Sequence, residues 1–471
     1  MNIMNIYKIE YEELEFAFGD KRLNKRGKQI LNSFFEKPSS SINGSFKGWG
    51  ETKACYRFFE NKKVKVEEIL KPHKVGTLKR IGGHDVILCI QDTTIIDYSH
   101  RLQKVEGLGK LRKENEQGFL MHPTIACSSS GLCLGILDNH IWTRDVLLGK
   151  KLRQESKPIE EKESLRWLKS YRMTQEIAVA NPNKVFINIA DREGDFYELL
   201  QEYDSKQAAN AHLLVRAKSD RKVKGGDGKI SKLWDEVENE KIDCHIEFKM
   251  SSIRQHKNKK KLRKGRSVRQ SVKVKRISLI PPEDVKQPKP VELTAILCSE
   301  INPPNDEEKI EWLLLTTLSS KDVLNVQQIV KYYVLRWNIE LFFKILKSGC
   351  KIEELQLETI DRLLNCITMY MIVAWRILFL SHLGRSCPDL PCDLFYDENE
   401  WKVVYTIAYK KKPPQIPPSI NAINRIIASF GGFLNRKSDG EPGIKSMWVG
   451  LQRLRDFTLA FETFQGVNIY G

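Results

Sequence analysis

Two short apolar runs, each closed by an aspartate, constrain the fold of this chain most. The first run covers 86–90 and leads through one glutamine to Asp92, and the second covers 184–190 and leads directly to Asp191. Short runs rich in valine and isoleucine are typical of buried strands. One such aspartate could be an ordinary cap or turn residue. Two of them predict a shared strand edge, where ligands bind in open α/β sheets.

Strand and helix patterns alternate around these runs. The expected elements include a hairpin around a Ser-Ser-Ser-Gly turn, an amphipathic helix, a shorter helix and a further strand, at 119–127 with 132–142, 158–180, 196–206 and 212–217. This order predicts a mixed α/β sheet.

A polar stripe marks one predicted helix nearer the C-terminus. The segment 327–348 has no glycine or proline and therefore favours a helix. At about 100° per residue, Tyr333, Arg336, Glu340 and Lys347 fall within an arc of roughly 60°. The alternative is a solvated helix face with incidental ion pairs.

Charge and motif content narrow the class of protein. A net charge of +17 over 471 residues indicates a polyanionic partner, with nucleic acid favoured over membrane. The longest apolar run, 366–380, is interrupted by Arg376 and is too short to span a bilayer, so we expect a buried helix. The sequence shows no signal peptide, paired-cysteine motif or nucleotide-binding loop, which predicts a cytoplasmic protein without a nucleotide cofactor.

Two basic segments are candidate DNA contacts. The first contains Arg22 and Arg26 among three lysines within two helical turns, and the second, 254–276, has twelve lysines or arginines and no acid. Both could be solvated surfaces. For the N-terminal segment the two interpretations are balanced, whereas the second lies mid-chain between predicted strands, which favours DNA contact.

Three carboxylates form a candidate metal site. Asp92 and Asp191 lie at strand ends, and Glu340 lies on the polar stripe. Clustered acids repel one another and need a cation, and oxygen ligands select Mg²⁺ or Mn²⁺. A pair of such ions can activate a nucleophile and stabilise the leaving oxygen at a phosphodiester.

Several motifs in a fixed order support this chemistry. They are Gly19-Asp20-x-Arg22, Ala54-x-Tyr56-Arg57-Phe58, Asp92-Thr-Thr, Asp191-Arg192-Glu193-x-Asp195, Val215-Arg216-x-Lys218, Glu300-Ile-Asn-Pro-Pro304, Trp312-Leu-Leu-Leu-Thr316, the Tyr333 to Lys347 stripe and Gly431-Gly-Phe433. With these motifs the chain resembles the bacterial insertion-sequence transposases of the DDE class that carry a Y-R-E-K signature. Within that class it is most similar to the cut-and-paste type found in the kanamycin-resistance composite transposon.

The resemblance implies an α/β fold with an RNase H-like mixed-sheet catalytic core. That core would occupy 76–365, interrupted by a β-rich insertion at about 220–320. A helical DNA-binding domain would precede it at 1–75, and a mostly helical dimerisation domain would follow at 366–471.

The resemblance also implies roles for individual residues. Asp92, Asp191 and Glu340 would be the catalytic metal ligands for two Mg²⁺ or Mn²⁺ ions, with Glu193 and Asp195 as weaker stand-ins. Trp312 would stack on a flipped base, although a core tryptophan is its alternative. The other DNA-binding residues would be Arg22, Arg26, Arg216, Tyr333, Arg336, Trp337, Lys344 and Lys347.

The implied function is cut-and-paste transposition. The protein would bind terminal inverted repeats, nick the DNA, form and open a hairpin, and join the ends to target DNA as a homodimer. Two alternatives remain: a metal-dependent nuclease without strand transfer, and a catalytically inactive DNA-binding or regulatory derivative of a transposase.

Overall fold

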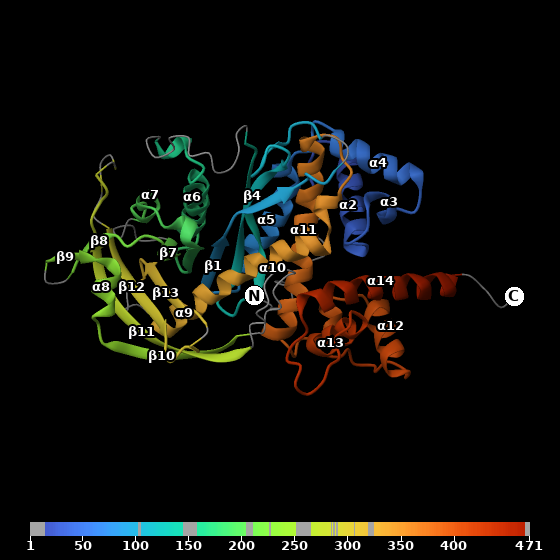
Figure 1. Ribbon diagram of the computed structural model, residues 1–471. Coiled ribbons are helices and arrows are strands. Elements are labelled where there is room, and N and C mark those ends of the chain that lie inside the picture. The colour runs from blue at the N-terminus through green and yellow to red at the C-terminus, as the bar shows by residue number, and fades with distance from the viewer. Residues whose placement is uncertain are drawn as a thin grey trace. The chain divides into compact units, whose positions relative to one another are not determined.

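The computed structural model describes residues 15–466, apart from 102–104, 145–157, 204–210, 226–227, 251–264, 284, 286–287, 289–290, 306 and 319–324. The chain divides into two compact units (Figure 1). Unit 1 contains 1–152 and 337–471, and unit 2 contains 153–336. Each unit is described by itself.

Antiparallel strands form the sheet of unit 1. Strand β4 (Gln117–Ser128) pairs with β1 (Val86–Gln91), β2 (Thr94–Asp97), β3 (Gly109–Lys110) and β5 (Cys133–Trp142). Strands β4 and β5 are the hairpin predicted around 128–131. Gly131 has φ of +90°, a conformation that favours glycine in such a turn.

Helices cover this sheet and fill unit 1. Helix α5 (Val66–Ile81) packs on β5, and α11 (Ile360–Ser386) packs on α5, β5 and the N-terminal helices (Figure 1). Those N-terminal helices are α2 (Lys21–Glu36), α3 (Ile42–Ser45) and α4 (Trp49–Glu60). The Asp20 side chain caps α2 by accepting from the Arg22 N–H.

Helix α11 is the predicted buried helix at 366–380. It is long and apolar enough to cross a membrane, but 89% of its most apolar window is buried inside the protein. Its Trp375 indole donates to the carbonyl oxygen of Cys133 at 3.0 Å. These contacts identify α11 as a core helix. Helices α12 (Glu398–Tyr409), α13 (Ile420–Phe430) and α14 (Ile444–Gly466) complete the C-terminal part.

Unit 2 is built on a mixed sheet. Strand β6 (Val185–Ala190) runs parallel to β7 (Ala211–Arg216), and β13 (Glu311–Thr316) pairs antiparallel with β7. Helix α6 (Leu165–Val179) packs on β6 and β7. The short helix α7 (Tyr197–Leu200) covers the start of the helix predicted at 196–206, of which 204–206 lie outside the described residues. The mixed α/β architecture predicted from the sequence is therefore confirmed.

The insertion before the polar stripe is rich in strands. Beyond β13 the sheet continues through β12 (Val291–Glu300) and β11 (Arg266–Leu279), with β10 (Ile242–Met250) and β8 (Lys222–Lys224) on β11, and β9 (Ile230–Lys232) on β8. Helix α8 (Leu233–Glu238) packs on β11 and β12. Residues 254–264 of the basic run predicted at 254–276 lie outside the described residues, which resume at Gly265.

The segment predicted as a helix at 327–348 is helical throughout, but it is not one regular α-helix. The structure divides it into α9 (Val326–Val334), a 3₁₀ turn (Leu335–Trp337), α10 (Asn338–Lys344) and a π-turn (Ile345–Gly349). A 3₁₀ turn advances about 120° per residue and a π-turn less than an α-helix. The constant angle that placed four side chains on one stripe therefore does not apply along the whole segment.

Candidate active site

Asp92 lies directly after β1, as predicted. The backbone N–H of Thr93 donates to its carboxylate at 2.7 Å. The buried His122 ring holds both neighbours of Asp92, because its Nδ1 is 2.9 Å from the Thr93 hydroxyl and its Nε2 is 2.8 Å from the Gln91 side-chain oxygen. This arrangement fixes the position of the backbone that carries Asp92.

Glu340 belongs to the same unit as Asp92. Helix α10 packs on β1. Before Glu340, the Asn338 amide donates to the Gly131 carbonyl at 3.1 Å. After it, the Lys347 ammonium donates to the Ile95 carbonyl and lies 3.6 Å from the Glu353 carboxylate. These contacts fasten both ends of the segment that carries Glu340 to the strands around Asp92.

A second cluster lies in unit 2 around Asp191. Because Ala190 pairs with Val215 in the parallel β6–β7 ladder, Asp191 and Arg216 follow at the same carboxyl edge. The Arg216 guanidinium donates to the Glu311 carbonyl at 3.2 Å. Burial raises the pKa of Tyr333, and Arg336, Arg216 and Asp191 are its charged neighbours. The structure thus brings four predicted residues together.

Arg216 is the most constrained member of this cluster. Burial lowers its pKa, Arg192 and Arg336 push in the same direction, and Tyr333 opposes them. Its Nε is buried and has no hydrogen-bond partner among the described residues. A buried unpaired donor between like charges is unfavourable. An anion near the Arg216 guanidinium would offset the repulsion from Arg192 and Arg336.

Trp312 is the first apolar residue of β13, and it is less buried than the leucines that follow it. It is partly exposed, whereas Leu313, Leu314 and Leu315 are buried. Its ring centroid lies 5.7 Å from that of Phe248 and 6.3 Å from that of Tyr333. A partly exposed ring among aromatic partners fits a stacking surface better than a core tryptophan.

Two carboxylates near Asp191 have structural partners. Asp195 has no exposed side-chain surface, accepts from the backbone N–H groups of Lys218 and Ser219, and pairs with Arg221 at 2.7 Å. Glu193 pairs with Arg166 at 2.5 Å. These contacts give both acids roles in the fold, which weakens them as substitute metal ligands.

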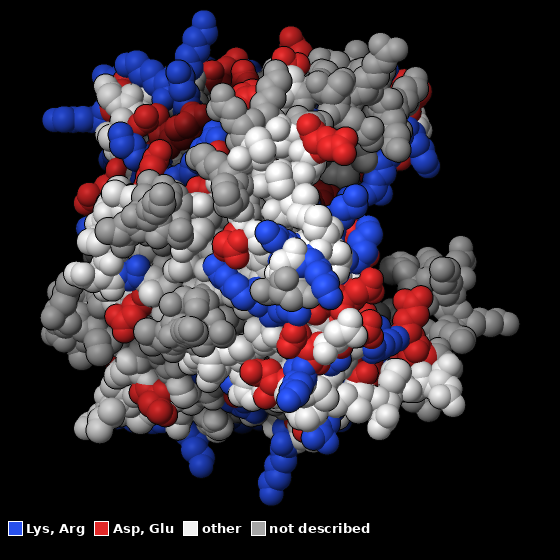
Figure 2. Space-filling view, turned by 90° about the vertical axis from the view of Figure 1, so that its left-hand side faces the viewer, with Lys and Arg blue, Asp and Glu red and all other residues white. Residues whose placement is uncertain are grey.

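The remaining predicted DNA contacts lie on surfaces of unit 1. Arg22 and Lys344 are exposed, Arg26 is partly exposed, and the Trp337 side chain is 57% exposed. Lysines and arginines also protrude among acids on the face in Figure 2. The net charge alone therefore does not identify the DNA-binding surface.

The three predicted metal ligands are drawn from both units. Asp92 and Glu340 belong to unit 1 and Asp191 to unit 2. Among the residues that the structure describes, no group of three or more His, Cys, Asp or Glu side chains is placed to hold a metal ion. The donor chemistry still fits Mg²⁺, since all three side chains offer hard carboxylate oxygens. The shared site remains a prediction.

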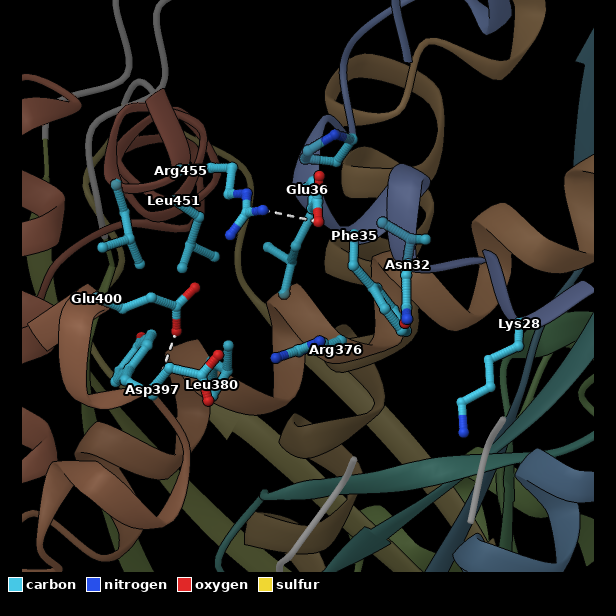
Figure 3. Close-up of a pocket in the computed structure, with 15 residues that line it drawn as sticks. Lys28, Asn32, Phe35, Glu36, Arg376, Leu380, Asp397, Glu400, Leu451 and Arg455 are labelled. Carbon is cyan, nitrogen blue, oxygen red and sulfur yellow. Dashed lines mark hydrogen bonds and ion pairs between the residues drawn. The ribbon is translucent and has the colours of Figure 1, made fainter. Parts of the chain in front are cut away.

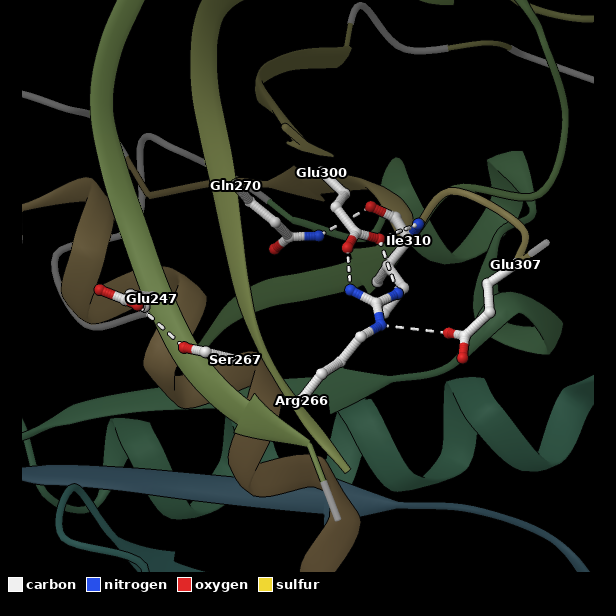
Figure 4. Close-up of polar contacts among 7 residues, drawn as sticks. All are labelled: Glu247, Arg266, Ser267, Gln270, Glu300, Glu307 and Ile310. Atoms are coloured by element: carbon white, nitrogen blue, oxygen red, sulfur yellow. Dashed lines mark hydrogen bonds and ion pairs between the residues drawn. The ribbon is translucent and has the colours of Figure 1, made fainter. Parts of the chain in front are cut away.

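An ion-pair cluster closes the strand ends of the insertion (Figure 4). Arg266 forks onto the buried Glu300 carboxylate and reaches Glu307 at 3.1 Å. Glu300 also accepts from the Ile310 N–H at 3.0 Å, and the Gln270 amide donates to the Ile310 carbonyl at 2.9 Å. We call these residues the Arg266 clasp. It holds Ile310, which directly precedes β13 and lies two residues before Trp312.

We expect Arg266→Leu to lower the free energy of unfolding by about 2 kcal/mol, because it leaves the Glu300 carboxylate buried without its cation. Chemical denaturation monitored by fluorescence measures this loss. Lys309→Leu is the control, since its pair with Glu311 is more exposed and should contribute less than about 1 kcal/mol. Equal losses in the two variants would contradict the assigned role of the clasp.

A cavity of about 330 Å³ lies in unit 1 away from these residues (Figure 3). Helices α2, α11, α12 and α14 supply its lining. Arg455 pairs with Glu36 at 2.8 Å, and the Glu400 carboxylate accepts from the Asp397 N–H at 2.9 Å. Burial raises the pKa of Glu400, although Asp397 and Arg376 oppose the shift. Its ionisation therefore makes the folded state less stable.

The raised pKa of Glu400 predicts a pH-dependent effect of Glu400→Gln. The folded state retains this proton more strongly than the unfolded state, so wild-type stability falls as pH rises from the unfolded pKa through the folded pKa. Glutamine preserves the capping box and cannot ionise. We expect a higher melting temperature for the variant at pH 8 and a smaller difference at pH 4. A pH-independent difference would refute this explanation.

Three family models match the chain in order. A transposase DNA-binding model matches residues 9–64, a transposase DDE domain model matches 194–375, and a transposase Tn5 dimerisation domain model matches 372–463. Together they cover more than half of the chain. The DDE match includes Glu340 but begins three residues after Asp191. The prediction that Asp92 and Asp191 are metal ligands therefore depends on their positions at strand ends.

One solved structure is similar over most of its length. It is the cryo-EM structure of a piggyBac transposase synaptic complex with hairpin DNA, with 8% sequence identity, a TM-score of 0.36, and coverage of 99% of this chain and 82% of that chain. A similarity this low establishes neither a shared fold nor a shared activity.

Proposed function

Because this chain belongs to the DDE insertion-sequence transposases of the Tn5 type, we propose that it excises and reinserts a DNA element by a cut-and-paste route. The observation that carries the proposal is the order of DNA-binding, DDE and dimerisation matches along one chain. A metal-dependent nuclease would need no such dimerisation segment. The presence of Asp92, Asp191 and Glu340 also disfavours an inactive derivative.

The catalytic core in this proposal is RNase H-like and spans 76–365. Asp92, Asp191 and Glu340 would hold two divalent ions. When bound, Mg²⁺ supplies charge stabilisation at the attacking and leaving oxygens of a phosphodiester. His122 keeps the Asp92 backbone in place. The anchored segment around Asn338 and Lys347 does the same for Glu340.

The cluster around Arg216 handles the DNA strand. Arg216 and Arg336 neutralise phosphates near the cut. Tyr333 supports the arginines, and Trp312 stacks on a base displaced from the duplex. Trp337, Lys344 and Lys347 contact the strands from unit 1.

We propose that the flanking segments recognise and pair the DNA ends. The domain at 1–75, with Arg22 and Arg26 on α2, binds the inverted repeats. The domain at 366–471 joins two protomers in a synaptic homodimer. The enzyme then acts inside the cell, on chromosomal ends and target DNA.

The test is an in vitro reaction with DNA that carries the inverted repeats flanking the natural element. The purified chain, Mg²⁺ and a target plasmid should yield a nick, a hairpin intermediate and a joined product. Cutting without joining would identify a nuclease, and binding without cutting would identify an inactive derivative.

A further inference from the structure

Phe248 lies beside Trp312 on one face of the insertion sheet. In the register, Phe248 faces Val268 across β10 and β11, Val272 faces Cys298, and Cys298 faces Trp312. Because partners in a ladder share a face and alternate residues return to it, Phe248 and Trp312 point to the same side. Their rings are 5.7 Å apart and close to parallel, at 21°.

This aromatic pair lies at the edge of the buried patch. Val268, Val272 and Cys298 share the face and are buried, whereas Phe248 and Trp312 are both partly exposed. An aromatic pair used only for packing gains most when it is fully buried. The exposed ring surface is therefore available to a planar ligand.

The surroundings of the pair indicate which planar ligand fits. The Arg216 guanidinium reaches the Glu311 carbonyl, one residue before Trp312, and Tyr333 lies 6.3 Å from the Trp312 ring. The Arg266 clasp holds the residue directly before β13, and next to the clasp the Ser267 hydroxyl donates to Glu247, the residue before Phe248 (Figure 4). A fixed aromatic surface beside a cation matches a nucleotide base and its phosphate.

We propose that Phe248 is a second base-stacking residue, which together with Trp312 holds the nucleotide displaced from the DNA end. This inference rests on the proposed transposase function and deepens it. Phe248 comes from β10, far in sequence from the Y-R-E-K segment, and none of the matched signature motifs includes it. Its role requires an aromatic ring rather than apolar bulk alone.

The experiment compares Phe248→Leu with Phe248→Tyr in the full chain. Leucine retains apolar packing and removes the ring, whereas tyrosine retains the ring. Ile246→Leu is the control, since Ile246 lies on the same strand and face and is partly exposed. The readouts are the nicking rate, the hairpin rate and the fluorescence of 2-aminopurine. The 2-aminopurine is placed in turn at each terminal position of the DNA end, and Ca²⁺ replaces Mg²⁺ in the fluorescence measurement.

We expect Phe248→Leu to slow hairpin formation roughly tenfold and to leave nicking within about twofold, because stacking on one ring is lost. The 2-aminopurine signal should fall, because a base that is held less well outside the duplex returns to the base stack, where its fluorescence is quenched. Phe248→Tyr and Ile246→Leu should match wild type. An abasic nucleotide at the displaced position should remove the difference between Phe248→Leu and wild type.

Three results for Phe248→Leu would overturn the stacking role: an unchanged hairpin rate, equal slowing of nicking and hairpin formation, or faster hairpin formation. The last result would mean that the Phe248 ring hinders the step. The fluorescence in Ca²⁺ separates this inference from the proposed function. A wild-type complex that unstacks a base but never cuts would refute the catalytic proposal while the Phe248 comparison still decides the stacking role.

Discussion

Glu340→Gln should abolish DNA cleavage, with a loss of at least about a thousandfold, while binding to the DNA ends stays within a few-fold of wild type. Glutamine keeps the size of the side chain and removes the charge that would hold a cation. The same result is expected for Asp92→Asn and Asp191→Asn. Gel-based cleavage and mobility-shift assays on one end substrate measure both properties.

The controls for this prediction are neighbouring acids with structural partners. Glu193→Gln loses its ion pair with Arg166 and should still cut. If Glu193→Gln abolished cleavage and Asp191→Asn did not, the ligand at the end of β6 would be Glu193. Loss of end binding in Glu340→Gln would mean that the residue acts on DNA rather than on metal.

Trp312→Ala should slow hairpin formation by roughly five- to a hundredfold and change the first nick much less. The estimate follows from about 1–3 kcal/mol for stacking one base on an aromatic ring. Only the step that displaces a base needs this stack. Single-turnover kinetics resolve the nick from the hairpin, and Trp312→Phe should recover part of the rate.

Trp234→Ala is the matched control for Trp312→Ala. Trp234 is another partly exposed tryptophan of unit 2, on α8 rather than β13. It should leave both steps near the wild-type rate. Equal slowing of nicking and hairpin formation in Trp312→Ala would mean that Trp312 only packs within the protein and does not stack on a base.

The sequence predicted those parts of the fold that depend on local pattern. The strands before Asp92 and Asp191 are where the apolar runs placed them, because buried strands need continuous apolar residues. The 3₁₀ and π turns within this helix were missed because an apolar pattern does not distinguish them from a regular α-helix. In the π-turn the Cys350 N–H donates to the Ile345 carbonyl five residues earlier, at 2.7 Å, and the Lys347 ammonium donates to the distant Ile95 carbonyl.

The functional cluster was predictable only in part. Arg216 and Tyr333 stood out as polar residues in recognisable motifs. Phe248 did not, because an apolar residue that alternates with Cys244 and Ile246 looks like ordinary core. His122 was missed as well, since only the pairing of β4 with β1 places it beside Gln91. A predicted strand register would have been the one signal able to identify both.

The central claim is that Asp92, Asp191 and Glu340 hold divalent metal together at the DNA end. Electron paramagnetic resonance of Mn²⁺, titrated into the protein bound to pre-nicked end DNA, tests it without depending on turnover. The claim predicts saturable binding in wild type that is weakened at least tenfold by Asp92→Asn, by Asp191→Asn and by Glu340→Gln, but not by Glu193→Gln. Wild-type Mn²⁺ binding in any one of the three carboxylate variants would contradict it.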